Sequence, residues 1–118
     1  DNHIASLKQL GFSLYEIVRR AIEFGPENGK VEIEVRNLDE LKQVVEAGAH
    51  IIMLDNMTIK DMQIAVEFVN GRSMLEASGG VDMDSVRAIA STGVDIISIG
   101  RLTHSATALD INLDIDPP

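Results

Sequence analysis

The chain alternates short apolar segments with longer segments in which apolar residues recur every three or four positions. Short apolar or alternating segments predict strands at 31–35, 51–54, 74–77 and 95–99. Helices are predicted to end near residues 24, 47, 69 and 92, with their N-caps at Ser13, Asn37, Thr58 and Asp82. Ser13 with Glu16 and Asn37 with Glu40 have the spacing of capping boxes. Equivalent strand positions lie 20 to 23 residues apart, so the chain repeats a unit of one strand and one helix.

Consecutive units of this kind predict a parallel sheet, because right-handed crossovers return every strand in the same direction. In the segment 31–35, Val31, Ile33 and Val35 alternate with Glu32 and Glu34, so the acids share one face of the sheet. An open sheet with helices on both faces would bury these carboxylates, whereas a barrel offers them a lumen. We therefore predict an α/β fold, a partial (β/α) barrel of TIM type with parallel strands. It amounts to about half of a full barrel, which takes eight strands and roughly 250 residues.

Composition narrows the functional classes. The 118 residues carry a formal net charge of −9, so no basic surface is present to bind nucleic acid. Cysteine is absent, which excludes disulfides and thiolate metal sites, and the apolar segments are too short to span a membrane. A cytoplasmic protein is expected. The chain starts at Asp1 with neither an initiator Met nor a targeting segment, and we expect it to be a piece of something longer.

Two acids lie where strands of a (β/α) barrel end. Glu34 and Asp55 belong to neighbouring strands, and functional residues of such barrels gather at the carboxyl ends of strands. Their carboxylates are hard oxygen ligands suited to Mg²⁺, with water and a phosphorylated substrate completing the shell. The alternative is that both are ordinary surface acids, with Asp55 acting as a helix cap.

Glycine-rich loops follow the next two strands. Ser78-Gly79-Gly80 precedes a predicted helix, and Gly100-Arg101-Leu102-Thr103 repeats the arrangement after the following strand. Exposed backbone N–H groups at such positions favour anions, and barrels often bind phosphate in the loops after their last two strands. The alternative is that the glycines only permit tight turns. We predict a phosphate site.

The histidines and methionines add little to this picture. His3, His50 and His104 lack the spacing of a metal site. His50 begins a strand at the opposite end of the barrel, so a structural role is expected, whereas His3 and His104 are possible site residues. The five methionines follow the apolar pattern and are expected to fill the core.

Taken together, several motifs resemble the C-terminal part of quinolinate phosphoribosyltransferase, also called nicotinate-nucleotide pyrophosphorylase (carboxylating). They follow the order and spacing of that family along almost the whole chain: Asp1-Asn2-His3, Val31-Glu32-Ile33-Glu34-Val35, Ile52-Met53-Leu54-Asp55-Asn56, Glu76-Ala77-Ser78-Gly79-Gly80, Val94-Asp95-Ile96-Ile97-Ser98 and Leu102-Thr103-His104-Ser105.

This resemblance implies phosphoribosyl transfer from phosphoribosyl pyrophosphate to quinolinate with decarboxylation, giving nicotinate mononucleotide for NAD biosynthesis. It implies a Mg²⁺ requirement and a homodimer. Glu34 and Asp55 match the acids that face the ribose hydroxyls and the metal. The motif Ser78-Gly79-Gly80 matches one phosphate loop and Ile99-Gly100-Arg101 the other, and His3 belongs to a Lys-Asp-Asn-His motif whose lysine is absent here. Arg101 departs from the family, which often has a small or apolar residue there.

The resemblance also implies how the chain is divided. Residues 1–105 match the C-terminal half of the barrel, and residues 106–118 form an expected strand that would pair with an absent N-terminal domain. In the family, the cations that bind the quinolinate carboxylates lie upstream of Asp1 and in the second subunit. We therefore expect the isolated chain to hold only the metal and phosphate half of the site and to be inactive.

Two other functions remain open from the residues alone. One is a paralogous barrel enzyme that uses another base or phosphosugar, since the base-recognising part lies upstream. The other is a non-catalytic half-barrel scaffold that self-associates through its unpaired edge strands.

Overall fold

The computed structural model describes residues 7, 9 and 11–104 and contains one four-stranded sheet with its helices. The strands are β1 (Glu32–Val35), β2 (Ile51–Asp55), β3 (Met74–Ser78) and β4 (Ile96–Ile97). The helices are α2 (Leu14–Phe24), α3 (Leu38–Ala47), α4 (Ile59–Val69), α5 (Val86–Ala90) and α6 (Arg101–His104). The strands are all parallel and lie in the order β1-β2-β3-β4, so each pairs with its neighbour in sequence.

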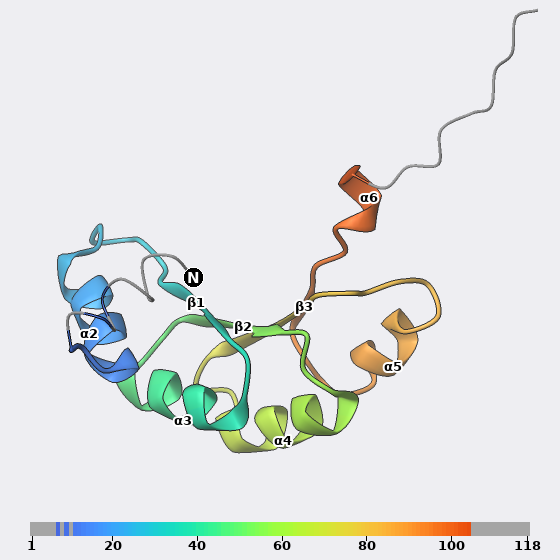
Figure 1. Ribbon diagram of the computed structural model, residues 1–118, viewed down its shortest axis with the longest axis horizontal. Coiled ribbons are helices and arrows are strands. Elements are labelled where there is room, and N and C mark those ends of the chain that lie inside the picture. Colours follow the sequence, from blue (N-terminus) through green and yellow to red (C-terminus); the bar gives the residue numbers. More distant parts are fainter. Residues whose placement is uncertain (1–6, 8, 10, 105–118) are drawn as a thin grey trace, which may run out of the picture.

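The core lies between the sheet and the helices that cover one of its faces. In Figure 1, α3, α4 and α5 all lie on the same side of the curved sheet. Ile33, Ile52 and Leu75 are aligned by the strand register and are buried on this face. Leu41 and Val44 of α3 pack into the same core. Apolar residues on one strand face and on one helical stripe therefore supply the main force for folding.

The alternation along β1 has the predicted effect. Ile33 and Val35 are buried against the helices, while Glu32 is exposed on the other face and Glu34 is partly exposed. Helices on one face and acids on the other are the arrangement of a barrel wall, not of an open sheet covered on both sides. The predicted partial (β/α) barrel is confirmed for the described residues.

Local signals place most helix ends correctly. Ser13 accepts a hydrogen bond from the Glu16 backbone at 3.2 Å, and the Glu16 carboxylate accepts one from the Ser13 backbone at 2.8 Å, which completes the capping box. Asn37 caps α3, but the second predicted box is only half formed. Its Glu40 carboxylate accepts from the backbone of Arg36, not from that of Asn37. Gly48 ends α3 at φ 84°, a left-handed conformation that favours glycine.

The last third of the described chain departs from prediction. The helix expected to start after Asp82 is only α5. Residues 83–85 form a turn before it, although the Asp82 carboxylate accepts from the backbone N–H groups of Asp84 and Ser85 as an N-cap does. The strand expected at 95–99 is only β4. At its start the Asp95 carboxylate, in place of a backbone carbonyl, accepts from the N–H of Leu75 at 2.7 Å. Residues 101–104, expected as loop, form α6.

The expected roles of the histidines and methionines are confirmed only in part. The structural role expected of His50 is confirmed, since its Nδ1 accepts from the Val31 backbone at 2.9 Å. Met62 is buried as expected, but Met74 and Met83 are 38% and 87% exposed and do not fill the core. Among the described residues, no helix combines the length and the apolar character that crossing a membrane requires.

Candidate functional site

Glu34 and Asp55, at the carboxyl ends of β1 and β2, both lie near the guanidinium of Arg36. Arg36 lies just after β1, and its Nη2 is 3.6 Å from Glu34 Oε1. The Nε of the same guanidinium is 3.6 Å from Asp55 Oδ2. The two acid side chains are 28% and 24% exposed, so a ligand can reach them. The convergence inferred from parallel strands is therefore present, and sequence reasoning missed the arginine that links the acids.

Asn56 is a second site residue that sequence reasoning missed. Its Nδ2 donates to Asp55 Oδ1 at 2.7 Å, and its backbone N–H donates to the carbonyl of Ser78 at 2.9 Å. It adopts φ 53°, a left-handed conformation that asparagine tolerates better than most residues. The N-cap of α4 is Thr58, so Asp55 is not a helix cap. Asn56 thus ties the end of β2 to the loop after β3.

The loop after β3 needs glycine for a steric reason. Gly79 has φ 89°, and a Cβ added there would lie 2.5 Å from the side-chain Cγ and Oδ1 of Asn56. Gly80 is also left-handed, at φ 60°, but its added Cβ would be 3.8 Å from the same oxygen. A side chain at Gly79 would therefore displace the Asn56 amide, in addition to the strain of the left-handed backbone.

The two glycine-containing loops line one cavity. It measures about 350 Å³ and lies between the ends of β3 and β4. Its lining residues are Ser78, Gly79, Gly80, Val81, Ser98, Gly100 and Arg101. The loops that the sequence assigned to phosphate are thus brought together, with one arginine between them. A guanidinium beside glycine-rich backbone is a suitable environment for a phosphate group.

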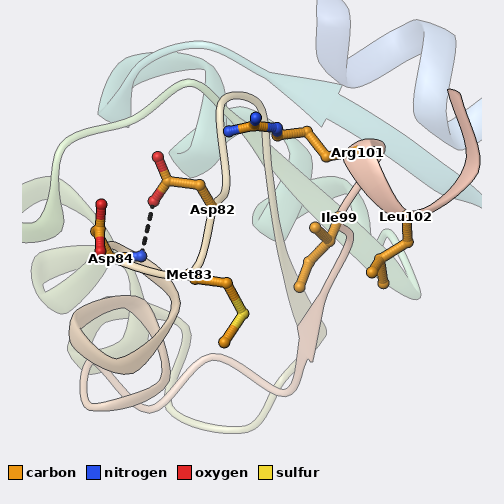
Figure 2. Close-up of a pocket in the computed structure, with 6 residues that line it drawn as sticks. All are labelled: Asp82, Met83, Asp84, Ile99, Arg101 and Leu102. Carbon is orange, nitrogen blue, oxygen red and sulfur yellow. Dashed lines mark hydrogen bonds between the residues drawn. The ribbon is translucent and has the colours of Figure 1, made fainter. Parts of the chain in front are cut away.

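A neighbouring cavity of about 280 Å³ is more apolar and shares Arg101 with the first one. Figure 2 shows Asp82, Met83 and Asp84 on one side of it and Ile99, Arg101 and Leu102 on the other, with the Arg101 guanidinium extending toward Asp82. Ile99, predicted as part of a phosphate loop, lines this second cavity and not the first. Hydrogen bonds from Ser85, first from its backbone and then from its side chain, hold the pKa of Asp82 below its usual value, and Arg101 lowers it further.

The other predicted site residues are less well placed. Thr103 lines neither cavity, and its hydroxyl donates to the carbonyl of Gly100 at 2.9 Å. His104 is the last residue of α6, and His3 lies outside the described residues. The predicted segment 106–118 is outside them as well.

Glu32 of β1 and Glu76 of β3 form a pair of acids on the face of the sheet opposite α3, α4 and α5. Glu76 is buried, with 8% of its surface exposed, and its Oε1 accepts from the Ser98 hydroxyl at 2.5 Å. Partial burial raises the pKa of Glu32, and the Glu76 carboxylate beside it raises it further. Since Ser98 also lines the larger cavity, this acid pair adjoins the candidate phosphate site.

The donor set at the strand ends fits a hard divalent cation. Glu34 and Asp55 offer carboxylate oxygens, and a guanidinium already lies against both. Within residues 7, 9 and 11–104, no group of three or more His, Cys, Asp or Glu side chains converges. The chain's described part therefore offers two carboxylates, and Mg²⁺ commonly takes one or two from protein together with water and substrate phosphate.

Comparisons with known proteins agree on one family. Residues 1–114 match the family model described as quinolinate phosphoribosyl transferase, C-terminal domain. The probable nicotinate-nucleotide pyrophosphorylase (carboxylating) of Methanocaldococcus jannaschii is 38% identical over 98% of this chain and 41% of that protein. Quinolinate phosphoribosyltransferase (decarboxylating) 2, mitochondrial, from Nicotiana glauca is 40% identical over 98% of this chain and 37% of its own length.

Solved structures give the same answer. The nicotinate-nucleotide pyrophosphorylase of Ehrlichia chaffeensis superposes with a TM-score of 0.81 at 41% identity, covering 98% of this chain and 40% of that one. The enzyme of the same name from Francisella tularensis has a TM-score of 0.75 at 44% identity, over 84% of this chain and 36% of that one. The chain thus spans about two fifths of the length of the relatives it matches.

Proposed function

Because the chain belongs to the family of the quinolinate phosphoribosyl transferase C-terminal domain, we propose that it forms the metal- and phosphate-binding part of such an enzyme. The reaction is transfer of the phosphoribosyl group from phosphoribosyl pyrophosphate to quinolinate. Carbon dioxide is lost, and nicotinate mononucleotide and pyrophosphate are released. The product is a precursor of NAD.

One observation carries the proposal. The two glycine-containing loops, far apart in sequence, line a single cavity of about 350 Å³ that also holds Arg101. Asn56 connects that cavity to Asp55 by direct contacts on both sides. A substrate that carries phosphate groups and binds a divalent cation suits such an arrangement, because both of its charged parts have partners at one end of the sheet.

Each residue has a proposed role in binding or orienting the substrate. Backbone N–H groups at Gly79, Gly80 and Gly100, with the Arg101 guanidinium, hold phosphate oxygens. Glu34 and Asp55 accept hydrogen bonds from the ribose hydroxyls and hold Mg²⁺, in part through water. When bound, Mg²⁺ neutralises negative charge on the pyrophosphate that leaves. Fixing both ends of the sugar phosphate in one orientation favours attack at its anomeric carbon.

Recognition of quinolinate is not assigned to the described residues. The uncovered face of the sheet carries Glu32, Glu34 and Glu76, which repel a dicarboxylate. The matched relatives have more than half of their length outside the region that this chain covers. We propose that the cations for quinolinate come from that other part, that a homodimer completes the site, and that the chain alone is inactive. A cytoplasmic location also stays a prediction.

The test is calorimetric titration of phosphoribosyl pyrophosphate into the 118-residue chain, with and without Mg²⁺. We expect binding that depends on Mg²⁺ and that Asp55→Asn weakens about tenfold, which corresponds to roughly 1.4 kcal/mol. Asp39→Asn is the matched control, because it removes the same charge from an exposed position on α3. Equal binding by both variants would contradict the role of Asp55.

The same titration separates the other candidate functions. Folded chain that binds no phosphoribosyl pyrophosphate under any condition favours the non-catalytic half-barrel scaffold. Equal affinity for unrelated phosphosugars favours a paralogous enzyme with another substrate. Product formation from quinolinate by the pure chain would refute the proposal that the missing part is required.

A further inference from the structure

Arg36 occupies a special position between the two acids assigned to the metal. It contacts Glu34 from its own strand end and Asp55 from the neighbouring strand, with both ion pairs at 3.6 Å. The guanidinium is thus the positive charge that these two carboxylates share. A divalent cation held by the same two side chains would bind the carboxylates that Arg36 now neutralises.

Asn56 narrows the choice of oxygens on Asp55. Its side-chain N–H group donates to Oδ1 at 2.7 Å, a short and well-formed hydrogen bond. Oδ2 is the oxygen that faces Arg36. Asn56 thus already uses part of the acceptor capacity of Oδ1, and a cation and the guanidinium both compete for the remaining negative charge of Asp55.

The Arg36 contacts are suited to exchange. Its side chain is 63% exposed, and 3.6 Å is beyond the 2.7–2.9 Å of a close charged hydrogen bond. Exposed ion pairs of this kind contribute little free energy because water and salt screen them. These two contacts can therefore be given up without a large loss when a more highly charged ion arrives.

We infer that Arg36 is a tethered counter-ion of the metal site: it neutralises Glu34 and Asp55 before a divalent cation binds, and it is displaced when the cation enters. This inference rests on the proposed function, in which these acids hold the metal. Arg36 is a positioning residue and takes no part in the chemical step. Its consequence is unusual, since removing a residue that touches both ligands should tighten metal binding.

The test measures Mn²⁺ binding by the loss of the free-ion signal in electron paramagnetic resonance. Mn²⁺ alone, with no substrate, is titrated into the 118-residue chain and into Arg36→Gln, Arg36→Lys, Lys42→Gln and Asp55→Asn. Lys42→Gln is the matched control because it removes one positive charge from nearby α3, where Lys42 pairs with Asp39 and not with the metal acids. Thermal unfolding of each variant checks that it is folded, and we expect Arg36→Gln, at an exposed position, to unfold like the parent chain.

We expect Arg36→Gln to tighten the site by roughly two- to fivefold, within the free energy that exposed ion pairs contribute, with less than about twofold for Lys42→Gln. Arg36→Lys should give a smaller gain, because an ammonium keeps the charge but cannot reach both acids with a planar fork. Unchanged or weaker Mn²⁺ binding by Arg36→Gln overturns the inference. Equal tightening by Lys42→Gln overturns it too, because the effect would then come from net charge and not from the contacts of Arg36. If neither the parent chain nor Arg36→Gln shows a Mn²⁺ site that depends on Asp55, the proposed metal site is wrong. This result is distinguishable from a failure of the counter-ion inference alone.

Discussion

Gly79 lies in the candidate phosphate loop after β3, close to Asn56, the residue whose side chain bonds to Asp55. Its left-handed φ of 89° and the 2.5 Å approach of an added Cβ to Asn56 are separate constraints. The second constraint couples the loop after β3 to the end of β2. A side chain at this position pushes Asn56 away from both Ser78 and Asp55. A substitution in the loop after β3 therefore also disturbs Asp55 at the end of β2.

We predict that Gly79→Ala lowers the free energy of unfolding and weakens the binding of inorganic pyrophosphate with Mg²⁺ about tenfold, which is roughly 1.4 kcal/mol. Gly71→Ala is the matched control, since Gly71 is also left-handed, at φ 75°, but has nothing within 4 Å of an added Cβ. It should show only the conformational cost of roughly 1–2 kcal/mol. Denaturant unfolding and calorimetry check both values, and equal effects of the two variants on binding would contradict the coupling.

The sequence alone was sufficient for some site residues and not for others. Glu34 and Asp55 could be placed together because parallel strand ends share one edge. The bridging role of Arg36 and the link made by Asn56 depend on side-chain rotamers and on a left-handed backbone, and neither leaves a periodic signal. The only local cue was an asparagine directly after a strand end, where its side chain can bond to neighbouring groups.

At the scale of elements, α2 depends on its first turn. Both hydrogen bonds of its capping box are present. The Ser13 backbone N–H and then the Ser13 hydroxyl donate to the Glu16 carboxylate and hold the pKa of Glu16 below its usual 4.5. We predict that Ser13→Ala lowers the free energy of unfolding by about 1 kcal/mol, whereas Ser13→Asp, another good cap, retains most of it. Urea titration monitored by circular dichroism measures the difference. The parent chain should lose the Glu16 contribution as pH falls below 4.5, because protonation removes the charged acceptor.

Glu32 of β1 has the opposite pH dependence. Burial, and then Glu76, raise the pKa of Glu32 above 4.5. In the folded chain this group therefore holds its proton to a higher pH than in the unfolded chain. Its favourable contribution is complete below 4.5 and is lost as pH rises through the raised folded value.

We therefore predict that Glu32→Gln raises the melting temperature at pH 7 relative to the parent chain, and that the gap closes as pH falls toward 4. Glu23→Gln, which removes one carboxylate from α2, is the comparison variant. Scanning calorimetry at several pH values tests this. A pH-independent difference for Glu32→Gln would mean that its pairing with Glu76 does not affect folding.

Elements with strong periodic signals were predicted well, while those governed by side chains were not. α2, α3 and α4 end where their caps and glycine or asparagine stops indicate. α5 is shorter than predicted, with residues 83–85 in a turn before its first residue. β4 is also shorter, and at its start the Asp95 carboxylate replaces a backbone carbonyl as the acceptor for the N–H of Leu75. Such competition depends on the tertiary position of one side chain, which hydrophobic spacing does not encode.

At the scale of the whole molecule, the described sheet has two open edges. β1 pairs only with β2 and β4 only with β3 within residues 7, 9 and 11–104. Unpaired strand edges tend to join other strands, and the net charge of −9 opposes close approach of two copies. We therefore predict self-association that grows with both protein concentration and added salt, because salt screens the repulsion.

Light scattering with size exclusion tests this at several protein and NaCl concentrations, and two variants locate the contact. Ile96→Lys places a charge on edge strand β4, where its register neighbour Glu76 offers it a partner within the same chain. Ile64→Lys makes the same charge change on exposed α4, away from both edges. We expect the first variant to stay near 12.8 kDa and the second to associate like the parent chain. If the parent chain keeps that mass under every condition, its edge strands do not associate and the prediction is wrong. If both variants dissociate equally, the contact is not at β4, and net charge alone controls assembly.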